Sequence, residues 1–300
     1  MGLNGKRLFR VPDALTEVTE TEKLELDKNN LTELPASISK LKNLIVLKLD
    51  NNKITELPVE IGDLRELKRL NVSNNQLVGL PTSIQRLTKL EWLYLYGNKL
   101  AELPAEIGDL RELRELWVSH NQLVDLPTSV QRLTKLQWLD LSGNKLTELL
   151  AEIGDLRELR GLNVSNNQLV GLPTSIQRLT KLEKLYLYEN KLTELPAEIG
   201  DLRELRELWV SHNQLAGLPT SVQRLTKLER LYLNANKLTE LPAEISDFRE
   251  LRELSVIRNP LTVDAIRRAS KLRKKGVRVY GVGGKHSGYC SYLEVRKKTR

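Results

Sequence analysis

Residues 90–112 read LEWLYLYGNKLAELPAEIGDLRE, and this unit of 23 residues recurs along most of the chain. Its frame is LxxLxLxxNxLxxLPxxIxxLxx, and its asparagine returns at a constant spacing. The asparagines are Asn29, Asn52, Asn75, Asn98, Asn121, Asn144, Asn167, Asn190, Asn213, Asn236 and Asn259. In such an array each repeat buries its apolar face against the next, so 300 residues need no separate globular cores.

The first part of each repeat predicts a short strand. Leu93 and Leu95 alternate with Trp92 and Tyr94, so the leucines point into the core and the aromatic residues point outward. Further along the repeat, apolar residues fall three apart, as Ile107 does before Leu110, which predicts tight helical turns. Because these turns are wider than a strand, we expect a curved α/β solenoid, or horseshoe. Its parallel β-sheet would line the concave face, and short helical or 3-10 turns would form the convex face.

Two further positions of the frame are interpreted as structural. Each asparagine amide can bond with backbone groups of adjacent repeats that would otherwise lack partners. Proline follows the second leucine after the asparagine in most repeats, as Pro104 follows Leu103, and fixes the direction of the chain. Leu150 replaces this proline in one repeat, and we interpret it as tolerated drift rather than as a hinge.

This frame resembles the leucine-rich-repeat family. The LPxxIxxLxxL segment is similar to the intracellular subclass that includes Ras-signalling scaffolds and plant intracellular Ras-group-related repeat proteins. The resemblance implies a non-enzymatic scaffold or recognition module of intracellular signalling, which grips a protein partner on its concave face. No basic-Val-x-Phe phosphatase-docking motif occurs, so assembly of a phosphatase complex is not expected.

The repeats divide the chain into four parts. Residues 1–20 match the second half of a repeat and form a partial N-terminal repeat, and residues 21–260 hold the regular repeats. Residues 261–282 predict a C-terminal cap made of an amphipathic helix and a short strand. Residues 283–300 predict a basic, flexible tail.

Charge and cysteine content narrow the function classes. Of the net charge of +8, residues 261–300 carry +10, from twelve Lys/Arg against Asp264 and Glu294, which leaves −2 for the rest. Nucleic acid or membrane contact would therefore depend on the tail, for which a solvated terminus is the preferred interpretation. The lone Cys290 and the lack of a signal-like or membrane-spanning apolar run predict a cytoplasmic protein. The sequons at Asn30, Asn71 and Asn163 keep secretion open as the alternative.

Aromatic side chains gather at outward strand positions, where the core does not need them. All four tryptophans and five of the eight tyrosines lie there or directly after a strand. They predict a protein-binding face with two aromatic patches around a polar gap. The alternative is that they stack into a ladder for stability. The predicted contact residues are Trp92, Tyr94, Tyr96, Glu115, Trp117, His120, Trp138, Asp140, Asn163, Lys184, Tyr186, Tyr188, Glu207, Trp209, His212, Arg230 and Tyr232.

An internal duplication supports this prediction. Residues 67–158 and 159–250 align with an offset of 92 and differ at 15 positions. Seven of these differences fall on the predicted concave face: Arg69/Gly161, Trp92/Lys184, Gly97/Glu189, Trp138/Arg230, Asp140/Tyr232, Ser142/Asn234 and Gly143/Ala235. The repeat frame was kept while the surface changed. Freer drift at exposed sites is the competing explanation.

No motif for catalysis or for a cofactor is found. Ser119 and His120 are neighbours in sequence, but adjacent residues of a strand need not meet. His286 and Cys290 are too few for a zinc site, and the run around Lys285 fails the phosphate-loop pattern. We therefore predict a monomeric, non-enzymatic protein with no small-molecule substrate, cofactor or metal. An innate immune pattern-recognition receptor is the alternative function.

Overall fold

The computed structural model describes residues 1–282. It divides into two compact units, residues 1–168 and residues 169–300, and each is described separately below. Both units repeat one local pattern, a strand of three residues, a turn and a short 3-10 helix, which agrees with the predicted solenoid. The predicted tail and its residues His286 and Cys290 lie outside the described part of the chain.

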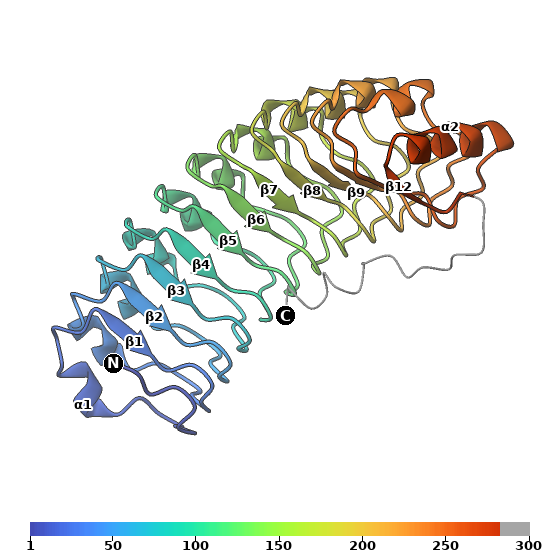
Figure 1. Ribbon diagram of the computed structural model, residues 1–300. Helices are drawn as coiled ribbons and strands as arrows, with labels where there is room; N and C mark the ends of the chain where they lie inside the picture. Colours follow the sequence, from blue (N-terminus) through green and yellow to red (C-terminus); the bar gives the residue numbers. More distant parts are fainter. Residues whose placement is uncertain (283–300) are drawn as a thin grey trace. The chain divides into compact units, whose positions relative to one another are not determined.

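The first unit contains seven parallel strands and six 3-10 helices (Figure 1). The strands are β1 Lys23–Glu25, β2 Val46–Lys48, β3 Arg69–Asn71, β4 Trp92–Tyr94, β5 Glu115–Trp117, β6 Trp138–Asp140 and β7 Gly161–Asn163. The 3-10 helices are η1 Ala36–Lys40, η2 Val59–Asp63, η3 Thr82–Arg86, η4 Ala105–Asp109, η5 Thr128–Arg132 and η6 Ala151–Asp155. Neighbouring strands pair with a register of one repeat, so that Leu93 of β4 lies between Leu70 and Leu116. We call the outward side of the strands the sheet face.

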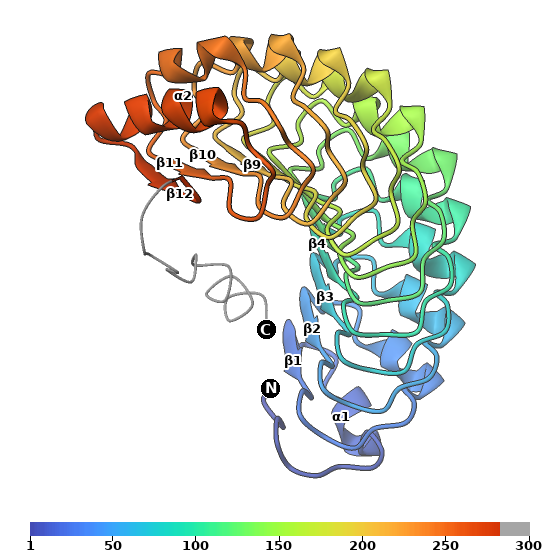
Figure 2. The ribbon, with the colours of Figure 1, turned by 90° about the vertical axis from the view of Figure 1, so that its right-hand side faces the viewer.

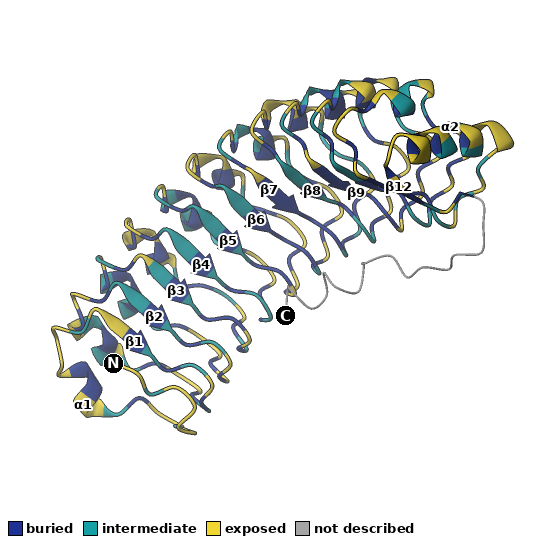
Figure 3. Ribbon diagram, viewed as in Figure 1, coloured by how far each residue is buried: buried dark blue, intermediate teal, exposed yellow. Residues whose placement is uncertain are grey.

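The core of this unit is built from the frame leucines and isoleucines. Leu93, Leu95 and Ile107 are fully buried, as the alternation and the spacing of three predict. In Figure 3 the strands from β2 to β6 are coloured mostly as partly buried, and β7 is coloured as buried. Burial of one such side chain contributes about 1.5–3 kcal/mol, and the contribution recurs in every repeat. The core is therefore complete without the outward residues of the strands.

The 3-10 helices lie on the side opposite to the strands in each unit (Figure 2). Most begin after a proline in the extended conformation, as at Pro104 with φ −67° and ψ 151°. Leu150 has nearly the same backbone, with φ −61° and ψ 151°, so the interpretation as tolerated drift holds. Successive helices pack closely, because a Cβ on Gly108 would lie 2.4 Å from the carbonyl oxygen of Ser129.

The repeated asparagines join neighbouring repeats through their side chains. Asn98 Nδ2 donates to the carbonyl oxygens of Val72 at 3.0 Å and Leu95 at 2.8 Å. Its Oδ1 accepts from the backbone N–H of Leu77 at 3.0 Å. Each such amide satisfies backbone groups that have no partner within their own strand, which confirms the structural role expected from the sequence.

The N-terminal segment corrects one expectation. Residues 1–20 do not hold only the second half of a repeat, because Gly2 forms a parallel bridge with Glu25 and Leu3 N donates to the Glu25 carbonyl oxygen. A short helix, α1 Asp13–Thr16, stands where later repeats have a 3-10 helix. The segment thus contributes the strand position as well, and it covers the edge of β1.

The second unit holds five parallel strands, four 3-10 helices and one longer helix within its described part. The strands are β8 Lys184–Tyr186, β9 Glu207–Trp209, β10 Arg230–Tyr232, β11 Glu253–Ser255 and β12 Arg278–Tyr280. The helices are η7 Thr174–Arg178, η8 Ala197–Asp201, η9 Thr220–Arg224, η10 Ala243–Asp247 and α2 Val263–Lys274. The Thr262 hydroxyl caps α2 by accepting from Ala265 N, and β12 pairs with β11. Among the helices of residues 1–282, none has the length and apolar character needed to span a membrane.

Candidate functional site

The sheet face presents two columns of side chains, because the first and third residues of each strand point outward. In the first unit, one column contains Trp92, Glu115, Trp138 and Gly161, and the other contains Tyr94, Trp117, Asp140 and Asn163. In the second unit, one column contains Lys184, Glu207, Arg230 and Glu253, and the other contains Tyr186, Trp209, Tyr232 and Ser255. The candidate site therefore consists of one cluster of side chains in each unit.

The aromatic residues of β4 to β6 form what we call the tryptophan cluster: Trp92, Tyr94, Trp117 and Trp138. Trp117 stacks on Trp138 with ring centroids 5.7 Å apart and planes inclined by 21°, and Tyr94 meets Trp117 at 6.3 Å. The guanidinium of Arg69 lies over the Trp92 ring, 4.7 Å from its centroid. The rings are therefore partly buried against one another rather than freely exposed. The stacking that the sequence suggested as an alternative is present, and partner binding stays a prediction.

A single carboxylate lies within the tryptophan cluster. Glu115 is flanked by Trp92 and Trp138 on the neighbouring strands. One of its oxygens accepts from the Tyr94 hydroxyl at 3.2 Å and from Trp117 Nε1 at 3.0 Å. Burial, and after it the charge of Glu115, raises the pKa of Tyr94 to about 12. The cluster thus combines apolar ring faces with the carboxylate of Glu115.

The polar gap predicted beside the cluster is buried, which corrects the assignment of two contact residues. Asp140 is only 2% exposed, and its Oδ1 accepts from Ser142 Oγ at 2.7 Å and from Ser142 N at 2.9 Å. Burial raises the pKa of Asp140 above its ordinary value. Asn163 is 6% exposed and accepts from Ser165 N. Because their strand neighbours cover them, Asp140 and Asn163 support the sheet face and do not offer their side chains to a partner.

Sequence reasoning missed two residues that shape the tryptophan cluster. A Cβ on Gly161 would lie 2.1 Å from ring carbons of Trp138, so the Trp138 ring lies over the glycine and requires it. Arg69 covers Trp92 by a cation–π contact. Arg69 and Gly161 align with each other in the duplicated blocks and differ in identity. This difference was the sequence signal that could have identified both residues.

The second unit carries an aromatic group around Trp209. Trp209 meets Tyr186 at 4.8 Å, Tyr188 at 6.4 Å and Tyr232 at 4.9 Å between ring centroids. Tyr232 is only 8% exposed, so its assignment as a contact residue is also corrected. Trp209 Nε1 is buried and has no hydrogen-bond partner within the described part of the chain.

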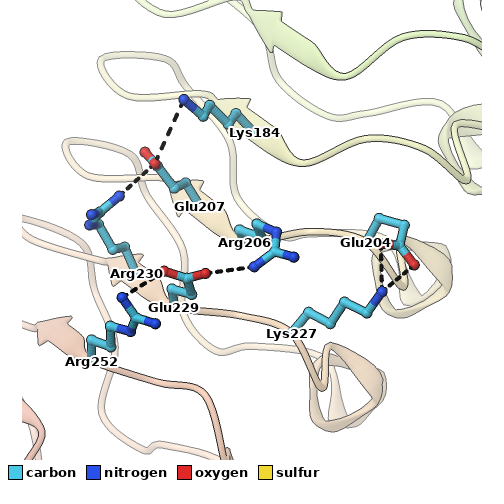
Figure 4. Close-up of polar contacts among 8 residues, drawn as sticks. All are labelled: Lys184, Glu204, Arg206, Glu207, Lys227, Glu229, Arg230 and Arg252. Atoms are coloured by element: carbon cyan, nitrogen blue, oxygen red, sulfur yellow. Dashed lines mark hydrogen bonds and ion pairs between the residues drawn. The ribbon is translucent and has the colours of Figure 1, made fainter.

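Charged residues lie on or near the strands of this second aromatic group, and Figure 4 shows the contacts among them. Glu207 accepts from Arg230 Nη1 at 2.6 Å and from the Tyr186 hydroxyl at 3.0 Å, while Lys184 Nζ lies 4.0 Å away. Glu207 is 8% exposed, so it is a buried partner of these residues and not a free contact. Directly before β10 and β9, Glu229 pairs with Arg206 at 2.7 Å. The carboxylates of Glu207 and Glu229 are therefore neutralised from within the chain.

The predicted histidines lie at turns beyond the strands. His120 and His212 adopt φ of 52° and 56° and are exposed, at one end of the sheet face. Ser119 is buried, and no hydrogen bond joins it to His120 in residues 1–282. Tyr96 is partly buried two residues after β4, and burial raises its pKa. The described residues also contain no group of three potential metal ligands among His, Cys, Asp and Glu.

Comparisons with known proteins agree with this geometry. The family described as Leucine-rich repeat region matches residues 13–97 and 184–286, Leucine rich repeat matches residues 111–169, and a further Leucine Rich Repeat family matches residues 89–110. No curated protein sequence matches the chain.

Solved structures extend the comparison. A leucine-rich-repeat protein of Leptospira interrogans is 33% identical with a TM-score of 0.67, covering 93% of this chain and 82% of that one. The Arabidopsis receptor kinase HAESA, solved with the peptide hormone IDA and the co-receptor SERK1, is 30% identical with a TM-score of 0.76. That match covers 87% of this chain and 46% of the receptor chain. An internalin of Listeria monocytogenes is 21% identical with a TM-score of 0.74, covering 95% and 86% of the two chains, and shares the fold.

Proposed function

This chain belongs to the leucine-rich-repeat family, whose members are protein-interaction modules, and from this premise we propose that its sheet face binds a protein partner through the tryptophan cluster. The observation that carries the proposal is the position of Trp92, Trp117 and Trp138. They lie outside a core that leucines already fill, on the face of adjacent strands. Tryptophan in such a position contributes strongly to protein interfaces, because it buries a large area with little loss of side-chain entropy.

Asp140 and Asn163, which are buried and do not contact a partner in this proposal, hold the neighbouring backbone in place. Asp140 fixes the start of the turn after β6 through Ser142, and Asn163 does the same for Ser165 after β7. A binding surface with pre-positioned side chains loses less entropy on association. The proposed contact surface of the first unit is therefore the tryptophan cluster with Tyr96, Glu115 and His120. In the second unit it comprises Lys184, Tyr186, Tyr188, Trp209, His212 and Arg230.

We further propose that the protein is a non-enzymatic scaffold of intracellular signalling and that it is cytoplasmic. The resemblance of the LPxxIxxLxxL segment to intracellular repeat proteins supports this, as does the single cysteine, Cys290. Binding to nucleic acid or membrane through the tail is not part of the proposal. The aromatic surface on the sheet face carries the recognition.

A receptor that captures a ligand outside the cytoplasm is the second candidate. The likeness to the HAESA receptor kinase, bound to a peptide hormone, favours it. Mass spectrometry of the protein from its native cells distinguishes the two, since glycans at Asn30 or Asn71 require the secretory route. Asn163 is not a useful reporter, because its side chain is buried.

Affinity capture from native cell lysate tests the proposed binding. The full chain is immobilised as wild type, as the W92A/W117A variant and as a K89A/K135A variant outside the strands. Lys89 and Lys135 form exposed ion pairs with Glu66 and Glu112, so their loss leaves the core intact. We expect a partner identified with the wild type to be lost by the tryptophan variant and retained by the lysine variant. Retention by both variants would refute the proposal.

A further inference from the structure

The duplicated blocks place two glutamates at equivalent positions with different surroundings. Glu115 and Glu207 are related by the offset of 92, and each accepts a hydrogen bond from the tyrosine of the preceding strand. The other oxygen of Glu207 accepts from Arg230 Nη1 at 2.6 Å (Figure 4). In this copy the chain itself supplies the cation that neutralises the carboxylate.

Among residues 1–282, no such cation pairs with the carboxylate of Glu115. In the aligned positions, Trp138 replaces Arg230 and Trp92 replaces Lys184. One oxygen of Glu115 accepts both of its hydrogen bonds, from Tyr94 and Trp117. Across residues 1–282 the second oxygen accepts none, and no lysine or arginine forms an ion pair with Glu115.

The nearest basic residues are engaged elsewhere. Arg69 lies over the Trp92 ring, and Arg114, which precedes Glu115, pairs with Glu91 at 3.1 Å. Glu115 therefore keeps an unused acceptor and an uncompensated charge in a partly buried aromatic setting. Such a charge is costly unless a cation approaches it.

The surroundings of Glu115 match the chemistry of a guanidinium group. A guanidinium is planar, stacks on aromatic rings and donates several hydrogen bonds toward a carboxylate. Both contacts already occur within this chain, since Arg69 stacks on Trp92 and Arg230 bonds to Glu207. The ammonium of Lys184 lies 4.0 Å from Glu207, whereas the guanidinium of Arg230 bonds to it at 2.6 Å.

We propose that the tryptophan cluster receives an arginine side chain of the partner protein, with its guanidinium bonded to the free oxygen of Glu115 and stacked on the cluster. This inference rests on the proposed protein binding by the sheet face. In the second unit the corresponding position is closed by Arg230. The first copy would thus bind an arginine of the partner at the position where the second copy holds its own Arg230.

The test uses the full chain and short peptides of defined charge. The probe is an acetylated and amidated five-residue peptide with a central arginine between alanines. Matched peptides carry citrulline, lysine or trimethyllysine instead. Binding is followed by tryptophan fluorescence and by thermal shift, since a ligand that binds only the folded state raises the melting temperature. We expect the arginine peptide to bind about tenfold more tightly than the citrulline peptide.

Three variants localise this binding. E115Q keeps the shape of the side chain and removes its charge, and we expect about a tenfold loss of affinity for the arginine peptide. E207Q is the matched control and should bind as the wild type does, because its carboxylate already pairs with Arg230. W138R introduces the arginine of the second copy and should abolish peptide binding with Glu115 unchanged. It also serves as the test if E115Q fails to fold.

Several results would overturn the inference. They are equal binding of the arginine and citrulline peptides, tighter binding of trimethyllysine, no saturable binding of arginine, or full affinity in W138R. Failure of this inference alone is recognised by affinity capture. If E115Q retains the native partner while W92A/W117A loses it, the sheet face binds protein but not through arginine. If both variants retain the partner, the proposed function fails as well.

Discussion

Replacement of Gly161 by alanine tests the arrangement of the tryptophan cluster most sharply. The added Cβ would lie 2.1 Å from Cε3 and Cζ3 of Trp138, far inside van der Waals contact. The ring must move, and its stacking on Trp117, with centroids 5.7 Å apart, is lost or strained. Overpacking of this kind costs about 1–3 kcal/mol of the free energy of unfolding.

Gly79→Ala is the matched control, because its Cβ would meet no atom within 4 Å and it lies in the same unit. We expect G79A to be neutral or slightly stabilising, since alanine restricts the unfolded chain. Both variants are measured by urea denaturation followed by circular dichroism, and tryptophan fluorescence reports the displacement of the ring.

A double-mutant cycle tests whether the methyl group of G161A clashes with the Trp138 ring. In a W138A background the ring is absent, so G161A should cost almost nothing there. The coupling energy should then equal most of the cost seen in the wild type, about 1–3 kcal/mol. If G161A is as stable as G79A, or if it costs as much with Trp138 removed, the described arrangement of the cluster is wrong.

Three further predictions follow from individual side chains. Asn121→Ala should lower the free energy of unfolding by roughly 2–4 kcal/mol, because it removes buried hydrogen bonds to the Leu95 and Val118 carbonyls. Gln122→Ala, at the exposed residue that follows, should cost little in the same denaturation assay. Asp140→Asn should raise the melting temperature at neutral pH. Burial in the folded state raises the pKa of Asp140 above its ordinary 3.8. The wild type therefore loses stability as the pH rises from 3.8 toward the folded pKa. The advantage of D140N should vanish in acid, where Asp140 is protonated in both states. The Tyr94 hydroxyl should titrate near pH 12, and E115Q should lower this pKa, as carbon-13 NMR of the tyrosine ring would show; an unchanged value would mean that Glu115 exerts no charge on it.

The fold could be predicted from the sequence because each repeat specifies its own conformation. The alternation around Leu93 sets the strand, and the spacing from Ile107 to Leu110 sets the tight turns. The strand register follows from the same repeat, since equal residues of successive units pair. The strand position of the N-terminal segment was not predicted, although Leu3 lies one repeat before Leu26. The frame asparagine, which marks every later repeat, is replaced there by Lys6.

The candidate site was less predictable. The repeat frame gives the direction of a side chain, but it does not tell how far residues of the neighbouring strands bury that side chain. Asp140 points outward as expected, yet Trp117 and Asn163 flank it and it is buried. Trp138 reaches over Gly161, a contact that depends on the missing side chain of the neighbouring strand. Such lateral packing joins residues one repeat apart and is invisible in a single repeat.

Affinity capture with the tryptophan variant of the sheet face and the lysine variant outside the strands tests the central claim most directly. A partner held by the wild-type chain should be lost when Trp92 and Trp117 are replaced by alanine. The same partner should be kept when Lys89 and Lys135 are replaced. Circular dichroism confirms that each variant is folded before capture. A folded tryptophan variant that still holds the partner, or a lysine variant that loses it, would contradict the claim that the sheet face is the binding surface.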